Sequence, residues 1–221
     1  QDTDPFTHGD DGNDIVEGNS GGDILYGDNG DDLVIGGADQ DQLFGNNGDD
    51  ILRPGDPTGA LTIGTDEVLG GDGVDVNDAG FDLIDFSDNT ARPGGVTFDV
   101  GNQQNPNVTV NGTPTQLPSF QIDGVIGSVS DDTLTGGSSA DAGNGASAAI
   151  AGDNWLIGGS GNDTFTGAGG NDIIVGGSIH LSTLIGKYGD TYDHNNNNDG
   201  TTDALLLQDA RYQGASHRVS Y

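Results

Sequence analysis

Hydrophobic and polar positions repeat with a period of nine between Gly9 and Arg53. In five successive segments the eighth residue is aliphatic, while the first six are mostly glycine or polar. The eighth-position residues are Val16, Leu25, Val34, Leu43 and Leu52. Because side chains alternate across a strand, the eighth residue points to one side and the seventh and ninth to the other. Two segments therefore predict one flattened coil of turn, strand, turn and strand, with the aliphatic ladder inside.

Glycine and aspartate occupy the turns at fixed places. Each segment begins with glycine, which adopts positive φ without steric cost. The sixth residue of each segment is Asp14, Asp23, Asp32, Asp41 or Asp50. Coils of two segments stack about 4.8 Å apart, so aspartates eighteen residues apart form two columns, one on each edge. Such close carboxylates repel one another, and calcium, which takes six to eight oxygen ligands, would neutralise them. The pattern indicates several calcium ions.

The segments GDDGNDIVE, GNSGGDILY, GDNGDDLVI, GGADQDQLF and GNNGDDILR resemble the G-G-x-G-x-D-x-U-x repeat of the RTX family. The resemblance implies an all-β fold, a parallel β-roll that is a calcium-binding solenoid. It also implies a secreted or cell-surface protein that leaves the cell unfolded through a type I exporter and folds outside on meeting calcium.

The repeat divides the chain into four parts. We expect a first β-roll block at 1–86, a non-repeat β spacer at 87–126, a second block at 127–178 and a C-terminal cap or tail at 179–221. The spacer also resembles those between RTX blocks, in a looser way. The second block adds the candidate ligands Asp132, Asn154, Asp163 and Asp172. Asn154 lacks the charge of aspartate, so we expect a weaker site there.

Two insertions interrupt the first block, near 54–60 and 76–81. Between them the repeat resumes and adds the candidate ligands Asp66 and Asp75, and Asp82 precedes a further strand. If the first insertion only loops out, the columns continue from Asp50 to Asp75 and from Asp41 to Asp66.

One set of outward positions is apolar. Ile15, Leu33 and Ile51 are seventh residues eighteen apart, so they stack into a ladder on the outside of one sheet. Soluble monomers seldom leave such a stripe bare. We expect this face to be buried, either by the chain's own spacer strands or tail, or by a neighbouring subunit.

The amino-acid composition restricts the partners and the type of protein that we expect. The chain has 36 Asp+Glu against 5 Lys+Arg, a net charge of -31, which excludes nucleic acid as a partner. No stretch approaches the roughly 20 apolar residues of a membrane span. The chain has no methionine and no secretory signal, so we expect a fragment or processed product. It also has no cysteine, and calcium can replace disulfides as the cross-link.

We expect no enzyme activity. The G-x-S-x-G pattern at 18–22 lies inside a calcium-type turn, without the strand and helix of a nucleophile elbow. The four histidines are scattered and form no H-E-x-x-H motif. The leading hypothesis is a calcium-binding module that supports secretion and stability of an extracellular protein. One alternative is a structural or adhesive unit of a surface layer or filament that self-associates. Another is the non-catalytic tail of a secreted hydrolase or peroxidase.

Overall fold

The computed structural model describes residues 6–55, 67–70, 80–87, 95–102, 108–110, 113–115, 119–137, 153–168, 172–176, 204–206 and 218–220. The candidate ligands Asp66 and Asp75 lie outside these residues, as does most of the expected C-terminal cap or tail.

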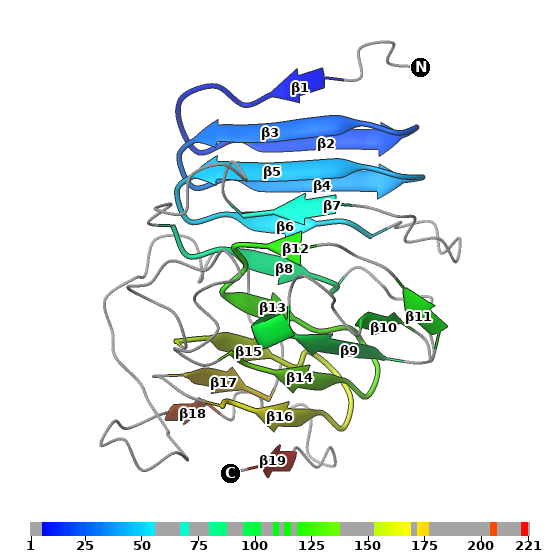
Figure 1. Ribbon diagram of the computed structural model, residues 1–221, viewed down its shortest axis with the longest axis vertical. Coiled ribbons are helices and arrows are strands. Elements are labelled where there is room, and N and C mark those ends of the chain that lie inside the picture. The colour runs from blue at the N-terminus through cyan, green and yellow to red at the C-terminus, as the bar shows by residue number, and fades with distance from the viewer. Residues whose placement is uncertain are drawn as a thin grey trace.

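Short strands arranged in three sheets make up the described part of the chain (Figure 1). The eight-stranded sheet contains, in spatial order, β2 (Ile15–Ser20), β4 (Leu33–Ala38), β6 (Ile51–Arg53), β8 (Leu83–Asp85), β13 (Gly124–Ile126), β15 (Trp155–Ile157), β17 (Ile173–Val175) and β18 (Ala204–Leu206). The five-stranded sheet contains β1 (Phe6–His8), β3 (Ile24–Asn29), β5 (Gln42–Asn47), β7 (Glu67–Leu69) and β12 (Ser119–Phe120). The six-stranded sheet contains β11 (Thr113–Thr115), β10 (Val108–Val110), β9 (Val96–Asp99), β14 (Thr133–Thr135), β16 (Thr164–Thr166) and β19 (Arg218–Ser220). A 3₁₀ turn, η1 (Val100–Asn102), follows β9, and no helix of the described residues is long and apolar enough to cross a membrane.

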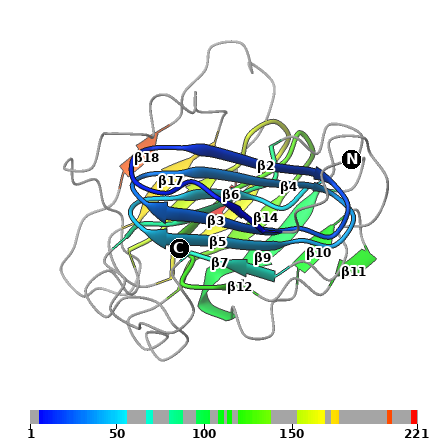
Figure 2. The ribbon, with the colours of Figure 1, turned by 90° about the horizontal axis from the view of Figure 1, so that it is seen from above.

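Strand pairing follows the eighteen-residue coil. Ile15 pairs with Leu33 and Leu33 with Ile51 in one sheet, and Leu25 pairs with Leu43 in the facing sheet. Every described pairing is parallel except those of β10 with β9 and with β11. From β1 to β8, successive strands alternate between the five-stranded and the eight-stranded sheet, as the view along the stack shows for the first coils (Figure 2). The prediction of an all-β parallel β-roll is confirmed.

The core lies between the facing sheets and is built from the eighth positions. Leu25, Val34, Leu43 and Leu52 are fully buried there, and Val16 is almost so. Further along the stack, aromatic residues including Phe98 and Phe165 continue the same cluster. Burying one such side chain contributes about 1.5–3 kcal/mol, so the ladder is a main source of stability.

The eight-stranded sheet is continuous along the molecule. Strand β13, at the end of the expected spacer, pairs on one side with β8 and on the other with β15. Strand β9, also in the expected spacer, pairs with β14 of the six-stranded sheet. These spacer strands therefore extend the roll rather than cover its outer face.

One prediction about the columns is wrong. The strand beside β6 is β8, which begins after Asp82, and the backbone N–H of Asp50 donates to Asp82 Oδ1 at 2.9 Å. Asp82, not Asp75, therefore follows Asp50 in the column. The cause lies in the strand that comes next: Leu83 and Ile84 are fully buried, whereas Asn77 stands where a strand after Asp75 needs an aliphatic residue.

The outward apolar ladder is buried at one end only. Ile51 is 2% exposed and packs in a second cluster with Leu83, Ile126 and Ile157, whereas Ile15 is 68% exposed. Leu33, between them, is half-buried. Burial within the chain holds for Ile51 and not for Ile15, because Ile15 lies on edge strand β2, at the far end of the sheet from that cluster. Burial of Ile15 by a neighbouring subunit stays a prediction.

Aromatic rings also stack outside the opposite sheet. The rings of His8 and Tyr26 lie 4.6 Å apart between centroids, and those of Tyr26 and Phe44 lie 4.8 Å apart, all nearly parallel. His8 Nδ1 lies 2.8 Å from Asp28 Oδ2, so the ladder ends in a polar contact. The rings shield one another's faces from water, and such contacts contribute about 0.5–1.5 kcal/mol beyond area burial.

Candidate metal centre

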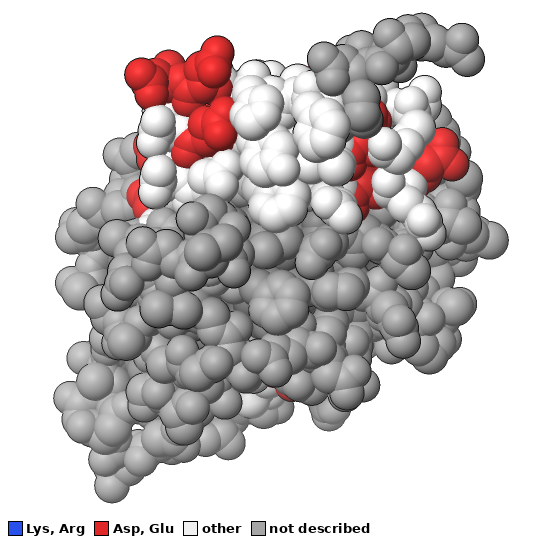
Figure 3. All heavy atoms as spheres, turned by 45° about the horizontal axis from the view of Figure 1, so that its top comes forward, with Lys and Arg blue, Asp and Glu red and all other residues white. Residues whose placement is uncertain are grey.

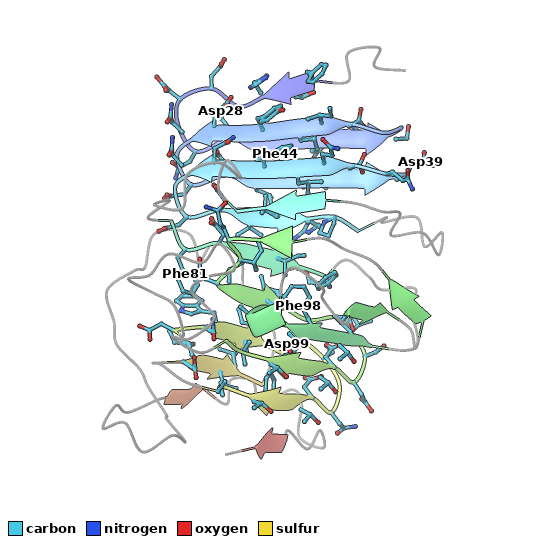
Figure 4. All side chains as sticks on the ribbon, viewed as in Figure 1. Asp28, Asp39, Phe44, Phe81, Phe98 and Asp99 are labelled. Carbon is cyan, nitrogen blue, oxygen red and sulfur yellow. The ribbon has the colours of Figure 1, made fainter. Side chains whose placement is uncertain are left out.

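The turns share one backbone shape, set by glycine and aspartate. In the first turn of the roll, positions two and four, Asp10 and Gly12, both have positive φ, 74° and 123°. The turn one coil further on repeats this at Asp28 and Gly30. In Figure 4, Asp28 and Asp39 mark turns at opposite edges of the roll. Positive φ bends the chain sharply enough to return each strand to the facing sheet within six residues.

The sixth-position aspartates form the predicted column on one edge. The N–H of Asp14 donates to Asp32 Oδ1 at 2.8 Å, and that of Asp32 to Asp50 Oδ1 at 2.8 Å. Each carboxylate thus has one oxygen fixed by the coil before it in the stack. The column continues through Asp82, whose N–H donates to Asp123 Oδ2 at 3.0 Å.

The other edge and the second block repeat the arrangement. The N–H of Asp23 donates to Asp41 Oδ1 at 2.9 Å, that of Asp132 to Asp163 Oδ1 at 3.0 Å, and that of Asn154 to Asp172 Oδ1 at 3.0 Å. Hydrogen bonds of this kind orient the side chains but satisfy only one oxygen of each.

The second carboxylate oxygen of the column aspartates differs from the first in its hydrogen bonding. In several of these aspartates Oδ2 is buried and accepts no hydrogen bond within the protein. These atoms are Oδ2 of Asp14, Asp23, Asp32, Asp41, Asp50, Asp163 and Asp172. A buried ionised oxygen without a partner is costly. The donor set fits calcium, because carboxylate oxygens are among its preferred ligands.

Backbone carbonyl oxygens near the aspartates can supply the remaining ligands of a calcium ion. No three His, Cys, Asp or Glu side chains of the described residues converge on one point, so a cation here takes its remaining ligands from carbonyls or water. First-position glycines keep carbonyl and carboxylate close: a Cβ on Gly27 would collide with Asp32 Oδ2 and lie 2.7 Å from the Gly45 carbonyl oxygen. The turns therefore leave room for oxygen atoms and not for side chains.

Acidic surface surrounds these columns. Asp and Glu side chains gather at the turn edges of the first coils, on either side of an uncharged strand face (Figure 3). Asp10, Asp11 and Asp39 are exposed there. This negative field attracts cations to the edges before any specific contact is made.

Burial perturbs the titration of the column carboxyls. Burial raises the pKa of Asp32 and Asp41 to about 6 and that of Asp163 to about 7. The hydrogen bond from the Asp14 N–H lowers the pKa of Asp32, and the charge of Asp14 raises it. Without a cation, folding therefore favours the protonated carboxyls.

These shifts predict opposite pH dependences with and without calcium. A folded-state pKa above the unfolded value of 3.8 contributes stability below about pH 4, which is lost as the pH rises through about 6 to 7. In calcium-free buffer the protein should thus keep more β-sheet circular dichroism signal at pH 5 than at pH 8. In millimolar calcium the order should reverse, because the cation binds the ionised form. Circular dichroism spectra at a series of pH values test this, and a calcium-free β-sheet signal that rises with pH would contradict it.

The structure brings together most of the predicted ligands. Asp14, Asp32, Asp50 and Asp82 share one column, and Asp23 and Asp41 lie on the other edge. Asp132 and Asn154 occupy sixth positions too, but their side-chain oxygens accept hydrogen bonds from within the protein.

Sequence reasoning missed Asp123. It is 4% exposed and stands between Asp82 and β13 in the column. Its turn spans only Gln121 to Asp123, so it lacks the glycine pattern. One feature of the sequence could have identified Asp123 as a column residue. It lies two residues before the buried Val125, which is the spacing between the sixth and eighth positions of the repeats.

A family model for the RTX calcium-binding nonapeptide repeat, which spans four copies, matches residues 8–43, 26–56 and 149–178. The chain carries RTX repeats. The matched RTX segments contain the column residues from Asp14 to Asp50, and also Asp163 and Asp172. No curated protein matches the chain. The RTX match and the stacked turns together make this a calcium-binding β-roll.

Proposed function

We propose that the chain is a non-catalytic module that folds outside the cell when it binds calcium, and so supports secretion and stability of an extracellular protein. The observation that carries the proposal is the buried, unbonded Oδ2 of Asp14 and Asp32 in adjacent coils. In the absence of a cation these atoms oppose folding, and with one they join neighbouring turns.

The proposed ligands are the column aspartates together with backbone carbonyls. On the described residues these are Asp14, Asp23, Asp32, Asp41, Asp50, Asp82, Asp163 and Asp172. Bound calcium neutralises the carboxylates. Asp66 and Asp75, outside the described residues, remain predicted ligands.

The free energy that calcium binding contributes at extracellular and at cytosolic calcium concentrations favours folding outside the cell. A site with an extracellular-type dissociation constant of about 10⁻⁴ M gains about 1.8 kcal/mol from about 2 mM calcium. At about 10⁻⁷ M calcium the same site gains less than about 0.01 kcal/mol. Typical domains are stable by about 5–15 kcal/mol in total, so a few such sites decide whether the chain folds.

A calcium titration of the metal-free protein tests the proposal. The circular dichroism signal of β-sheet should appear with a midpoint between about 10⁻⁴ and 10⁻³ M free calcium. A midpoint below about 10⁻⁶ M would mean that the chain folds before export, and a signal independent of calcium would remove the metal from the account. Magnesium at the same concentrations is the control, because it demands stricter octahedral geometry and dehydrates reluctantly.

One observation favours a second function, self-association. Ile15 is 68% exposed and Phe6 52% exposed, and both lie on the strands at the N-terminal end of the stack. Exposed apolar side chains beside edge strands favour pairing with another chain. Sedimentation velocity in calcium separates the two functions: a monomer supports the folding module, and calcium-dependent assembly supports the structural unit.

A further inference from the structure

The turn at 127–132 closes differently from the turns of the first block. Asp132 is 2% exposed, and both of its carboxylate oxygens are bonded within the protein. Oδ1 accepts from the Val96 N–H at 2.6 Å and from the Ser128 hydroxyl at 2.8 Å. Oδ2 accepts from the Ser128 N–H at 2.8 Å. The Ser128 hydroxyl oxygen in turn accepts from the Ser130 N–H at 3.1 Å, so the network is closed.

Asp32 shows what this network replaces. It has the same place in its turn and the same burial, 1% exposed. Its Oδ1 accepts the N–H of the preceding coil, as that of Asp132 does, but its Oδ2 accepts no hydrogen bond. Ser128 therefore supplies at Asp132 the two donors that Asp32 lacks.

Backbone shape gives an independent distinction. The next turn on the same edge, 158–163, has positive φ at its second and fourth positions, 85° at Gly159 and 127° at Gly161. At the corresponding Ser128 and Ser130 φ is not positive. The two turns stack directly, since the Ser160 N–H donates to the Ser128 carbonyl. The 127–132 turn thus lacks the conformation of the turns that end at Asp14, Asp32 and Asp163, whose Oδ2 atoms accept no hydrogen bond.

The side chain of Asn154 is also satisfied by hydrogen bonds within the protein. Asn154 Oδ1 accepts from the Gly137 N–H at 2.6 Å, and Nδ2 donates to the Asp123 carbonyl at 3.0 Å. The neutral amide therefore joins two coils without a cation. Asp132 and Asn154 belong to the two turns of one coil, on either side of β14.

We propose that neither the turn at 127–132 nor Asn154 binds calcium, with the donors of Ser128 and the amide of Asn154 in place of the cation. This inference rests on the proposed calcium-dependent module and refines it. The roll then has calcium sites before β13 and again at Asp163 and Asp172, and hydrogen bonds take the place of calcium at Asp132 and Asn154 between them. Calcium removal should leave the hydrogen bonds of Asp132 and Asn154 unaltered.

A matched pair of variants in the full chain tests the inference. Asp32→Asn and Asp132→Asn make the same change at equivalent buried positions. Bound calcium is counted by native mass spectrometry, and melting temperature is measured in saturating calcium. Asp32→Asn should bind fewer ions than the wild type. Asp132→Asn should bind as many as the wild type yet melt at a lower temperature in saturating calcium, because an amide nitrogen would face the Ser128 N–H.

Loss of calcium from Asp132→Asn comparable to that from Asp32→Asn would overturn the inference. If Asp132→Asn does not fold, Ser128→Ala replaces it, since this variant keeps the carboxylate and removes only the hydroxyl. An ion count equal to or above that of the wild type then supports the inference, and a lower count overturns it. A wild-type protein that binds no calcium would instead refute the proposed function.

Discussion

Transfer of the calcium-loaded protein into excess chelator should abolish most of its β-sheet circular dichroism signal at neutral pH. The reason is the charge left in the columns: Oδ2 of Asp14 and of Asp32, in adjacent coils, is buried and accepts no hydrogen bond. An unpaired buried charge typically costs about 3–5 kcal/mol. A few such sites equal the whole stability of an ordinary domain, about 5–15 kcal/mol.

Restoring calcium should recover the signal, whereas an equal concentration of magnesium should not. Stopped-flow mixing with chelator gives the rate of loss, and equilibrium spectra give its extent. Retention of the full sheet signal after chelation would show that hydrogen bonds and the aliphatic ladder suffice to hold the roll together.

Gly27→Ala should destabilise the calcium-loaded protein by about 3 kcal/mol or more. The added Cβ would collide with Asp32 Oδ2, lie 2.7 Å from the Gly45 carbonyl oxygen and lie 3.0 Å from Asp32 Cβ. Backbone on one side and a buried carboxylate on the other leave no direction in which it can relax. The same methyl group would displace an oxygen from the proposed calcium site, so calcium affinity should fall as well.

Gly12→Ala is the matched control. Its Cβ would meet no heavy atom within 4 Å, although φ at Gly12 is 123°. This variant should lose only about 1–3 kcal/mol of stability, because of the strained backbone at residue 12, and it should bind calcium as the wild type does. Chemical denaturation in saturating calcium compares the two variants. A Gly27→Ala variant no less stable than Gly12→Ala would refute the close packing of oxygen atoms inside the turn.

The regular part of the fold could be predicted because one period sets both the strand faces and the turns. The burial of Val16, Leu25 and Val34 and the pairing of Asp14 with Asp32 follow directly from a coil of eighteen residues. No long-range information is needed for this, since each residue meets its counterpart one coil away.

Asp82 could not be chosen over Asp75 by the same reasoning. The string GGDGVD is a complete turn by pattern, and the outcome depends on the strand that follows it, where Leu83 and Ile84 enter the core. The role of Ser128 was hidden for a different reason. Serine at a second position looks like an ordinary turn residue, and only the position of its hydroxyl and N–H against Asp132 shows that it satisfies the carboxylate.

The most direct test is a crystal structure of the protein grown in calcium, with anomalous differences measured to locate the ions. Calcium should lie about 2.3–2.6 Å from Oδ2 of Asp14 and of Asp32, inside the stacked turns. Calcium bound only at exposed carboxylates such as Asp10 and Asp11, with nothing beside the buried Oδ2 atoms, would contradict the central claim that these columns are the metal sites.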